Sequence, residues 1–317
     1  MAEEKIKRKI IIADGNNLGW MAFGIAPLTY KEQRVEAIYV GLNMIRGYLQ
    51  RFGPTQFCVA WDSGRDERRL AVYPNYKKRR KVELTEVEKR ERGLFFNQLR
   101  ELQRVLESFG IRQYKVKGKE ADDVIISLIN ELSMGDSSSE HFIIVSTDKD
   151  FYQAFSLYDN VSVYNPVKRE IIEASDVEKR FNIPIKYFLE YRAMVGDPSD
   201  RLPGVRGIGP KWAAWAINNI FAPSLESFVK KEFTQSQENV IAKLDSEDFE
   251  LMCSLVEFKE ILKKELREGK FEDRPETCAE LQERGIEICE RYGFERHANN
   301  FTNFILPFEM LWRKGER

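Results

Sequence analysis

Three short apolar segments of this sequence each run directly into acidic residues. Residues 10–13 lead to Asp14, residues 56–61 lead to Asp62, and residues 140–146 lead to Asp148 and Asp150. Short apolar runs bounded by turn residues are typical of buried strands. Because segments with helical spacing lie between them, the pattern predicts an α/β fold with a mixed, mostly parallel sheet. Binding sites in such sheets form beyond the carboxyl ends of the strands, which is where these acids fall.

The composition excludes several classes of protein. With 317 residues, 43 % of them hydrophobic, the chain is long enough for two domains with buried cores, and intrinsic disorder cannot describe it as a whole. Four cysteines without a CxxC pair and only two histidines argue against a zinc site and indicate free thiols in a reducing compartment. The apolar run at residues 10–12 is too short for a signal peptide or a membrane span, so we expect a soluble cytoplasmic protein.

A second region starts near Pro184, and the charge is distributed unevenly along the chain. We expect an α/β domain over residues 1–182 and a helical region over residues 183–317. Residues 65–92 hold eleven basic and six acidic residues, whereas residues 221–317 hold 15 basic and 21 acidic ones. The net charge of the whole chain, -1, hides this contrast.

Nine acids lie at strand ends, at a helix start or in Gly/Pro-containing loops. They are Asp14, Asp62, Glu120, Asp122, Asp123, Asp148, Asp150, Asp197 and Asp200. Any one of them alone is better explained as a helix cap or a turn former. Capping does not explain acids after three separate strands, however, and carboxylates are the ligands of Mg²⁺ and Mn²⁺. On an extended segment Asp148 and Asp150 would point to one side, and two ions about 4 Å apart would clamp an in-line phosphoryl displacement.

Two further features indicate contacts with phosphate. Gly204, Gly207 and Gly209 precede a predicted helix and form the hairpin of a helix–hairpin–helix element, with Lys211 as an added cation. By itself such a glycine pattern is also compatible with an ordinary tight turn. Residues 77–81 are five consecutive cations, which could form a solvated surface or a phosphate-contacting segment with nearby tyrosines stacking on bases.

Six motifs together resemble one family. IIADGNN, AWDSG, GKEADD, STDKD, VGDPSD and LPGVRGIGPKWA occur in the order found in structure-specific 5′ nucleases. These are the flap endonucleases, the phage 5′-3′ exonucleases (including phage ribonuclease H) and the 5′-nuclease domain of bacterial DNA polymerase I. The resemblance covers residues 10–221, and the length without a polymerase domain is similar to a phage or small bacterial enzyme.

The resemblance implies a PIN-like nuclease core with a helical arch at about residues 64–93, and a helix–three-turn–helix element at about residues 185–220. It also implies roles for individual residues. Asp14, Asp62, Glu120 and Asp122 match the first metal site, Asp123 matches an acid acting through water, and Asp148, Asp150, Asp197 and Asp200 match the second metal site. Lys77 and Arg80 match arch cations at the scissile phosphate, with Lys78 or Arg79 as alternatives in register, and Tyr76 matches an aromatic that stacks on a base. Gly204, Arg206, Gly207, Gly209 and Lys211 match the duplex-binding hairpin, where backbone carbonyls in relatives also hold K⁺.

The function implied is a 5′-3′ exonuclease or flap endonuclease that uses two Mg²⁺ ions, with Mn²⁺ as a substitute, in replication or repair. Its expected partner is DNA with a 5′ flap, an overhang or an RNA primer, bound by a monomer associated with the nucleoid of a bacterial or phage-infected cell. We expect the acidic tail to be a packing domain, with a single-strand-binding protein as a conjectured partner. The alternatives are a non-catalytic branched-DNA-binding protein of the same fold and a PIN-type ribonuclease, which would lack the hairpin element.

Overall fold

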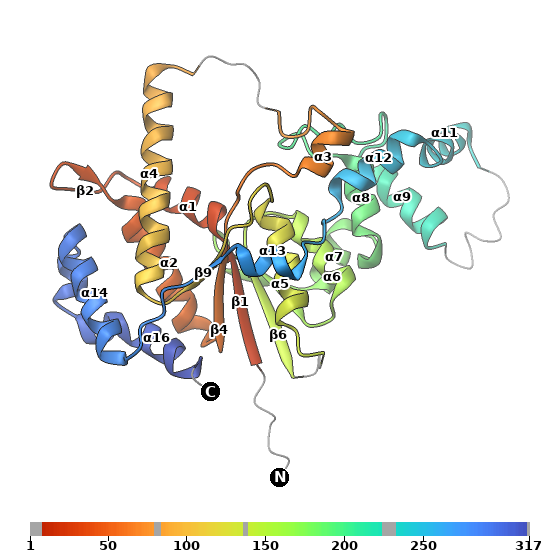
Figure 1. Ribbon diagram of the computed structural model, residues 1–317. Coiled ribbons are helices and arrows are strands. Elements are labelled where there is room, and N and C mark those ends of the chain that lie inside the picture. Colours follow the sequence, from red (N-terminus) through yellow and green to blue (C-terminus); the bar gives the residue numbers. More distant parts are fainter. Residues whose placement is uncertain (1–7, 79–83, 136–138, 224–232, 316–317) are drawn as a thin grey trace, which may run out of the picture. The chain divides into compact units, whose positions relative to one another are not determined.

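The computed structural model describes residues 8–78, 84–135, 139–223 and 233–315 (Figure 1). The chain divides into two compact units, each made of separate stretches. Unit 1 comprises residues 1–63, 82–146 and 260–317, and unit 2 comprises residues 64–81 and 147–259. This division differs from the expected one at residues 182 and 183 in two ways. Residues 64–81 and 147–182 belong to unit 2, and residues 260–317 return to unit 1.

A mostly parallel sheet forms the centre of unit 1. Its strands are β1 (Arg8–Asp14), β4 (Gln56–Ala60), β5 (Arg112–Tyr114), β6 (Glu140–Val145) and β9 (Lys270–Phe271). Within the unit their order is β6-β1-β4-β5-β9, and only β9 runs antiparallel to its neighbour. Ile12 pairs with Cys58 on one side and Ile144 on the other. The three strands predicted from the sequence are therefore confirmed, and they end side by side.

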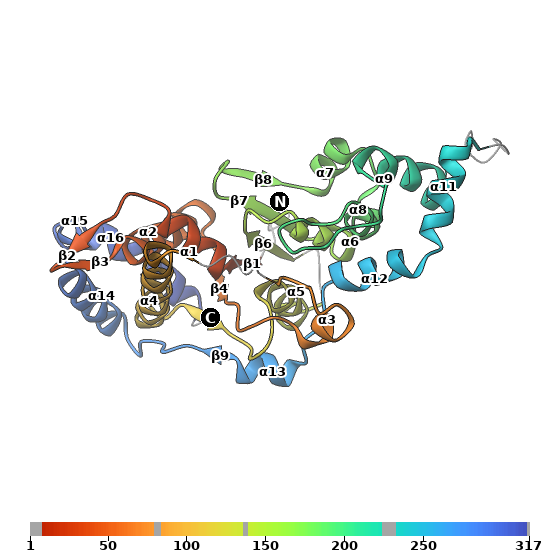
Figure 2. The same cartoon turned by 90° about the horizontal axis from the view of Figure 1, so that it is seen from above.

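Helices cover both faces of this sheet (Figure 2). On one face lie α1 (Gly15–Phe23), α2 (Glu36–Phe52), α4 (Glu86–Ser108) and α16 (Phe301–Lys314), and on the other lie α5 (Ala121–Leu132) and α13 (Lys263–Glu268). Ile10, Ile11 and Ile12 are fully buried between these layers. Unit 1 also contains the short hairpin of β2 (Thr29–Tyr30) and β3 (Gln33–Arg34), and helices α14 (Cys278–Tyr292) and α15 (Glu295–Ala298). Continuous apolar strands are the expected consequence of a parallel sheet buried on both faces.

Helix α4 starts in solvent. Thr85 and Glu88 form a capping box, in which the side chain of each accepts the backbone N–H of the other. Residues 85–90 are exposed, and the first fully buried side chain of the helix is Phe95. The predicted arch thus includes the exposed beginning of α4, while Arg79, Arg80 and residues 81–83 lie outside the described residues.

Unit 2 is mainly helical. Its elements are α3 (Glu67–Val72), η1 (Asp150–Gln153), α6 (Ala154–Leu157), β7 (Val161–Asn165), β8 (Glu170–Ile172), α7 (Ala174–Phe181), η2 (Ile185–Tyr187), α8 (Phe188–Val195), α9 (Pro210–Ala216), η3 (Ile217–Phe221), α11 (Gln235–Leu244) and α12 (Glu247–Val256). Strands β7 and β8 form an antiparallel hairpin. Within unit 2 the aromatic rings of Tyr152, Phe181 and Phe188 pack together, with centroids 5.3–6.4 Å apart.

Helix α3 is fastened to the end of α12 by a buried arginine. Arg69 is 3 % exposed, and its guanidinium donates to the carbonyl oxygens of Leu255 (3.0 Å) and Glu257 (2.9 Å). Asp66, which is fully buried, caps α3 by accepting the N–H of Arg68 at 2.8 Å. The first half of the predicted arch region is therefore anchored within unit 2.

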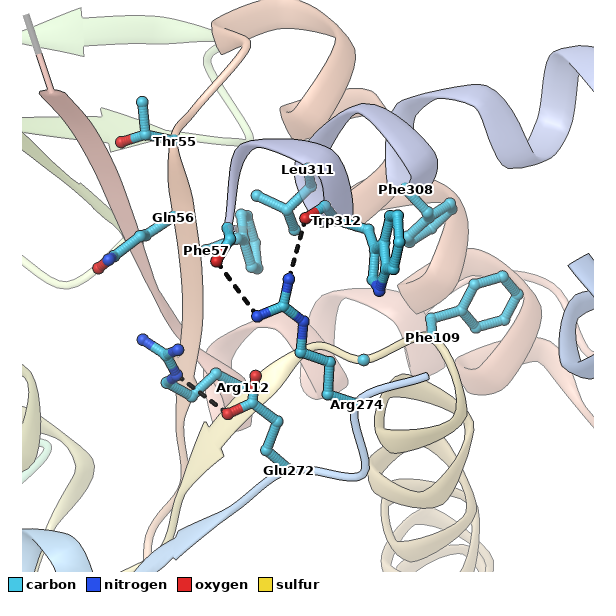
Figure 3. A pocket seen from close by; sticks show the side chains of 12 residues that line it. Thr55, Gln56, Phe57, Phe109, Arg112, Glu272, Arg274, Phe308, Leu311 and Trp312 are labelled. Atoms are coloured by element: carbon cyan, nitrogen blue, oxygen red, sulfur yellow. Dashed lines mark hydrogen bonds and ion pairs between the residues drawn. The ribbon is translucent and has the colours of Figure 1, made fainter. Parts of the chain in front are cut away.

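The final part of the chain is anchored in unit 1 around Arg274 (Figure 3). Its guanidinium donates to the carbonyl oxygens of Trp312 (3.1 Å) and Gly315 (3.2 Å), so the segment after β9 is attached to the end of α16. Arg274 and Trp312 line a pocket together with Arg112 of β5 and Glu272, and Arg112 donates to Glu272 at 3.2 Å. The expected single packing domain beyond Phe221 is thus divided between the two units, because residues 260–317 complete the sheet and its helical cover.

No helix within the described residues is long and apolar enough to cross a membrane.

Candidate active site

Asp14 ends β1 and also caps α1. One carboxylate oxygen, Oδ1, accepts the N–H of Asn17 at 3.0 Å, and the other, Oδ2, accepts from Ser146 Oγ at 3.1 Å. Its residue is 8 % exposed. The capping interpretation of this acid is therefore correct, and the cap fixes a carboxylate at the strand ends where a cation could bind.

Asp62 connects the starts of two helices in unit 1. Its Oδ1 accepts the N–H of Ala121 at 2.8 Å, and its Oδ2 accepts from Asn16 Nδ2 at 2.7 Å. Both donors are neutral, so they orient the carboxylate without cancelling its charge. Backbone N–H groups at a helix start favour a negative group, which makes α5 part of this arrangement.

The other three candidate acids of unit 1 lie at the start of α5. Glu120 directly precedes the helix and is 3 % exposed, while Asp123 is fully buried in its first turn. Asp122 lies between them in sequence and is half-buried. These three with Asp14 and Asp62 are called the unit 1 acids below. They lie at strand ends and a helix start, as the sequence predicts.

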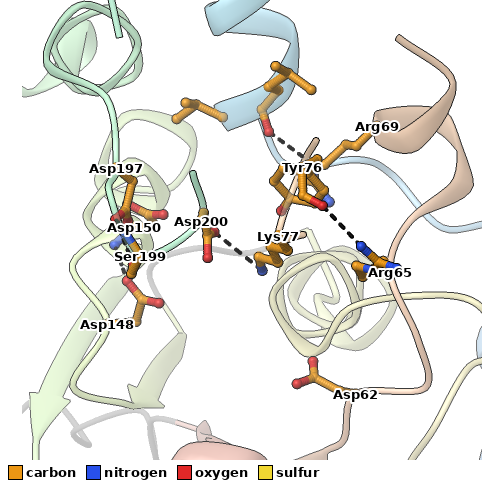
Figure 4. A network of polar contacts seen from close by, with 12 residues as sticks. Asp62, Arg65, Arg69, Tyr76, Lys77, Asp148, Asp150, Asp197, Ser199 and Asp200 are labelled. Atoms are coloured by element: carbon orange, nitrogen blue, oxygen red, sulfur yellow. Dashed lines mark hydrogen bonds and ion pairs between the residues drawn. The ribbon is translucent and has the colours of Figure 1, made fainter. Parts of the chain in front are cut away.

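Three acids of unit 2 converge (Figure 4). Asp150, Asp197 and Asp200 each offer an oxygen, and these oxygens all lie within 4.8 Å of one another. Among the described parts of the chain, this is the one set of three acids, histidines or cysteines that meets this spacing. Three carboxylates so close together match the hard oxygen ligands of Mg²⁺ and Mn²⁺. These three are called the unit 2 acids below.

A closed loop brings Asp197 and Asp200 to this position. Asp197 and Leu202 exchange two backbone hydrogen bonds of 2.8 Å, so the residues between them form a tight turn. The backbones of Gly196 and Gly204 are in contact, since a Cβ on Gly196 would lie 2.4 Å from the nitrogen of Gly204. Both glycines have positive φ, at 77° and 65°, and no larger residue would fit either constraint. The glycines of this region therefore shape the acidic loop as well as the hairpin.

Arg192 of α8 is a site residue that the sequence analysis misses. Its Nε donates to Asp150 Oδ1 at 2.6 Å and its Nη2 donates to Asp197 Oδ2 at 2.8 Å. Charge-assisted bonds of this kind are stronger than bonds between neutral groups. An arginine within an apolar helical pattern carries no local signal of its partners, which lie in other segments.

The unit 2 acids have shifted pKa values. Burial, and then the charge of Asp148, raises the pKa of Asp150 to about 6. Burial also raises the pKa of Asp200, against the effect of Lys77. Burial would raise the pKa of Asp197 too, but hydrogen bonds from Ser199 and the charge of Arg192 lower it overall. Crowded carboxylates with raised pKa values are the groups that a divalent cation would stabilise in their charged form, so this donor set fits a metal ion.

Asp148 differs from its predicted conformation. Strand β6 ends at Val145, and η1 begins at Asp150, so the two acids flank a turn rather than sharing one side of an extended segment. The carboxylate of Asp148 accepts the N–H of Asp150 at 2.9 Å. Aspartates commonly make this local bond to the backbone two residues on, which competes with an extended chain. Asp148 lies outside the set of three converging acids.

Lys77 lies beside the unit 2 acids. Its backbone N–H donates to the carbonyl oxygen of Asp200 at 3.0 Å, and its Nζ is 3.4 Å from Asp200 Oδ2 (Figure 4). Lys78 instead interacts with Asn75, whose Oδ1 is 3.4 Å from its Nζ. Lys77 is therefore the described cation of this basic stretch that contacts an acid of the candidate site, whereas Arg79 and Arg80 lie outside the described residues.

Tyr76 is 3 % exposed, and its carbonyl oxygen accepts from Arg65 Nη1 at 3.2 Å. The cations of Arg69 and Lys77 lie 5.8 and 5.3 Å from its ring centre. Stacking on a base would require the ring to leave this position. An exposed aromatic ring is found instead in unit 1, at Trp20 of α1, six residues after Asp14. Trp20 is 51 % exposed, and its ring stacks on Phe95 with the ring centres 3.7 Å apart.

The predicted hairpin joins α8 to α9. Gly204 is buried, whereas Arg206, Gly207, Gly209 and Lys211 are exposed. Val205 and Ile208, each 4 % exposed, anchor the loop from inside. The alternation presents the backbone of the two exposed glycines and both cations to solvent, which is suitable for contact with phosphates.

Comparison with known proteins identifies the family. Residues 9–182 match the family model described as the 5′-3′ exonuclease N-terminal resolvase-like domain. This chain belongs to the 5′-3′ exonuclease family. A 5′-3′ exonuclease of Aquifex aeolicus is 30 % identical over 263 residues, covering 82 % of this chain and 85 % of the relative. The resemblance stated from the six motifs is confirmed, and the family match ends at the residue predicted as the end of the nuclease core.

Solved structures show the same fold. The bacteriophage T5 5′-exonuclease with bound zinc is 24 % identical, with a TM-score of 0.65, and the match covers 78 % of this chain and 89 % of that one. A complex of the bacteriophage T5 flap endonuclease with DNA and metal ions is 21 % identical, with a TM-score of 0.62, and covers 98 % of this chain and all of that one. The mixed, mostly parallel nuclease fold predicted from the sequence is thereby confirmed.

Proposed function

We propose that this member of the 5′-3′ exonuclease family is a structure-specific 5′ nuclease that hydrolyses phosphodiesters of branched or RNA-primed DNA with divalent metal ions. The observation that carries the proposal is the convergence of Asp150, Asp197 and Asp200 beside Lys77. A phosphodiester repels an anionic nucleophile, and carboxylate-bound cations with a nearby lysine offset that repulsion. The relatives named 5′-3′ exonuclease support the same reaction class.

Each group of acids would hold one metal ion. In unit 2 the ligands would be Asp150, Asp197 and Asp200, with Asp148 orienting Asp150 through its backbone. In unit 1 they would be Asp14, Asp62, Glu120 and Asp122, with Asp123 acting through water. When bound, Mg²⁺ or Mn²⁺ supplies a lowered pKa for a bound water and positive charge for the leaving oxygen.

The protein's own residues would orient the ligands and the substrate. Neutral donors would hold Asp14 and Asp62 in fixed directions, and Arg192 would compensate part of the charge of Asp150 and Asp197 before a metal ion binds. Lys77, with Arg80 or one of the neighbouring cations Lys78 and Arg79, would contact the scissile phosphate. The hairpin loop of Gly204, Arg206, Gly207, Gly209 and Lys211 would bind the duplex through its exposed backbone, so that shape and charge rather than base edges select the junction.

Finer assignments follow the same proposal. The preferred ion would be Mg²⁺, and K⁺ would bind the carbonyl oxygens of the hairpin loop. The substrate end would be a 5′ flap, an overhang or an RNA primer, and the enzyme would act as a monomer associated with the nucleoid. A single-strand-binding protein would be a partner of the acidic tail.

The test is cleavage of a 5′-labelled flap duplex in Mg²⁺, with EDTA as the matched condition. We expect a cut near the junction of single strand and duplex in Mg²⁺ and none in EDTA. Binding of the flap without a cut would instead support the non-catalytic branched-DNA-binding protein. Preferential cutting of single-stranded RNA would support the PIN-type ribonuclease.

A further inference from the structure

An open pocket of about 500 Å³ lies between the hairpin loop and two helices of unit 2. Arg206 comes from the loop, Asn239 and Lys243 come from α11, and Ser246 and Asp248 come from the start of α12. Helix α11 packs against α9, which directly follows the loop. No motif covers α11, so the sequence gives this helix no role.

Lys243 reaches the backbone of the hairpin. A Cβ built on Gly207 would lie 2.8 Å from Lys243 Nζ, so the ammonium group is placed directly at this turn. The end of α11 is fixed by Ser246, whose Oγ donates to the carbonyl oxygen of Lys243 at 2.6 Å. The packing of α11 and this local bond therefore fix the backbone from which the Lys243 side chain extends toward the hairpin.

The charge of the pocket favours an anion. Within the described residues, neither Arg206 nor Lys243 forms an ion pair, and Asp248 is the single acid of the lining. The Asn239 side chain adds amide donors. Two cations and an amide beside an exposed glycine backbone match the donors that hold a phosphate group.

We propose that Lys243, with Arg206 and the Asn239 amide, binds a backbone phosphate of the duplex next to the one held by the hairpin. This site rests on the proposed function and extends it, because it recruits a helix from the region that is acidic in sum. Asp248 opposes binding and limits its strength. The duplex contact would then continue from the hairpin onto α11.

The experiment measures binding of a fluorescent blunt duplex in EDTA, where no cleavage can occur, over a series of KCl concentrations. Lys243→Ala should weaken binding about 3–10-fold, and the slope of log Kd against log salt should fall by about 0.9, as expected for one lost phosphate contact. Lys168→Ala is the matched control, since Lys168 is a cation of unit 2 on the turn between β7 and β8. Asp248→Asn should tighten binding about 2-fold, by removing the opposing charge.

The proposal is overturned if Lys243→Ala and Lys168→Ala bind the duplex equally well. It is also overturned if Lys243→Ala weakens the binding of single-stranded DNA as much as the binding of the duplex. Failure of the proposed function has a different signature: the unaltered protein would not bind the duplex in this assay, or would not cut the flap in Mg²⁺.

Discussion

Two acids of unit 1, Asp14 and Asp62, and two acids of unit 2, Asp150 and Asp197, accept hydrogen bonds from different kinds of donors. Asp14 and Asp62 accept from backbone N–H groups, an amide and a hydroxyl, all of them neutral. Asp150 and Asp197 accept from the guanidinium of Arg192. Neutral donors fix the direction of a carboxylate and leave its charge intact, whereas a guanidinium already compensates part of that charge. The difference implies that a cation entering unit 2 competes with a cation of the protein.

The largest expected effect comes from the neutral-donor group. Asp14→Asn should lower kcat for flap cleavage by about 10³-fold or more, roughly 4 kcal/mol in the barrier, because a metal ligand loses its charge. Since asparagine caps a helix as well as aspartate does, the melting temperature should change little. Stopped assays and thermal unfolding would measure the two quantities.

Asp176→Asn provides the control for Asp14→Asn, because Asp176 also accepts a backbone N–H at a helix start, that of the N-cap residue Glu173 at 3.0 Å. It should cut at the normal rate. Normal cleavage by Asp14→Asn would remove unit 1 from the catalytic assignment.

The guanidinium group is tested by Arg192→Gln. Without metal, the loss of its bonds to two carboxylates should destabilise the protein by about 1–3 kcal/mol, lowering the melting temperature by about 2–10 °C. Added Mg²⁺ should then raise the melting temperature more in this variant than in the unaltered protein, because the ion no longer competes with arginine. Differential scanning fluorimetry with and without Mg²⁺ measures both shifts.

Arg180→Gln, at an exposed position of α7, is the matched control and should show neither change. A smaller Mg²⁺ shift in Arg192→Gln than in the unaltered protein would mean that Arg192 helps to organise the ligands rather than competing with the ion.

The smallest expected effect concerns the stability of the fold at low pH, which must be known before a loss of cleavage at low pH is assigned to the acids of the site. His297 stacks between Tyr39 (4.9 Å) and Phe304 (4.3 Å), and burial lowers its pKa from 6.5 to about 4. As the pH falls from about 6.5 to 4, the unfolded chain takes up this proton before the folded chain does. The contribution of neutral His297 to the free energy of unfolding is therefore fully present above about pH 6.5 and is lost as the pH falls toward 4. Allowing for partial exposure, the loss is on the order of 1 kcal/mol.

His297→Phe keeps the stacking and removes the titrating group. Urea unfolding at several pH values should therefore show a flatter profile for this variant below pH 6.5 than for the unaltered protein. Identical profiles of the free energy of unfolding against pH would mean that groups other than His297 cause the loss of stability in acid.

Much of the fold follows from local pattern, whereas several features of the site do not. The strands before Asp14 and Asp62 are predictable because their apolar runs fit a sheet buried on both faces. The turn between Asp148 and Asp150 is missed because side-chain bonding to the backbone overrides an extended reading. Arg192 is missed because its partners come from distant segments, and the burial of Tyr76 could not be read from a stretch dominated by cations.

The return of residues 260–317 to unit 1 has a consequence for the order in which the protein can be completed. During synthesis, β1, β4, β5 and β6 emerge early, but β9 and α16 emerge only after the long stretch of unit 2, residues 147–259. Until then the edge of β5 lacks its neighbour, and β4 lacks α16, one of the helices that pack on it. A nascent chain that already contains every acid of the candidate site therefore still has an open sheet edge, and its last segment closes that edge.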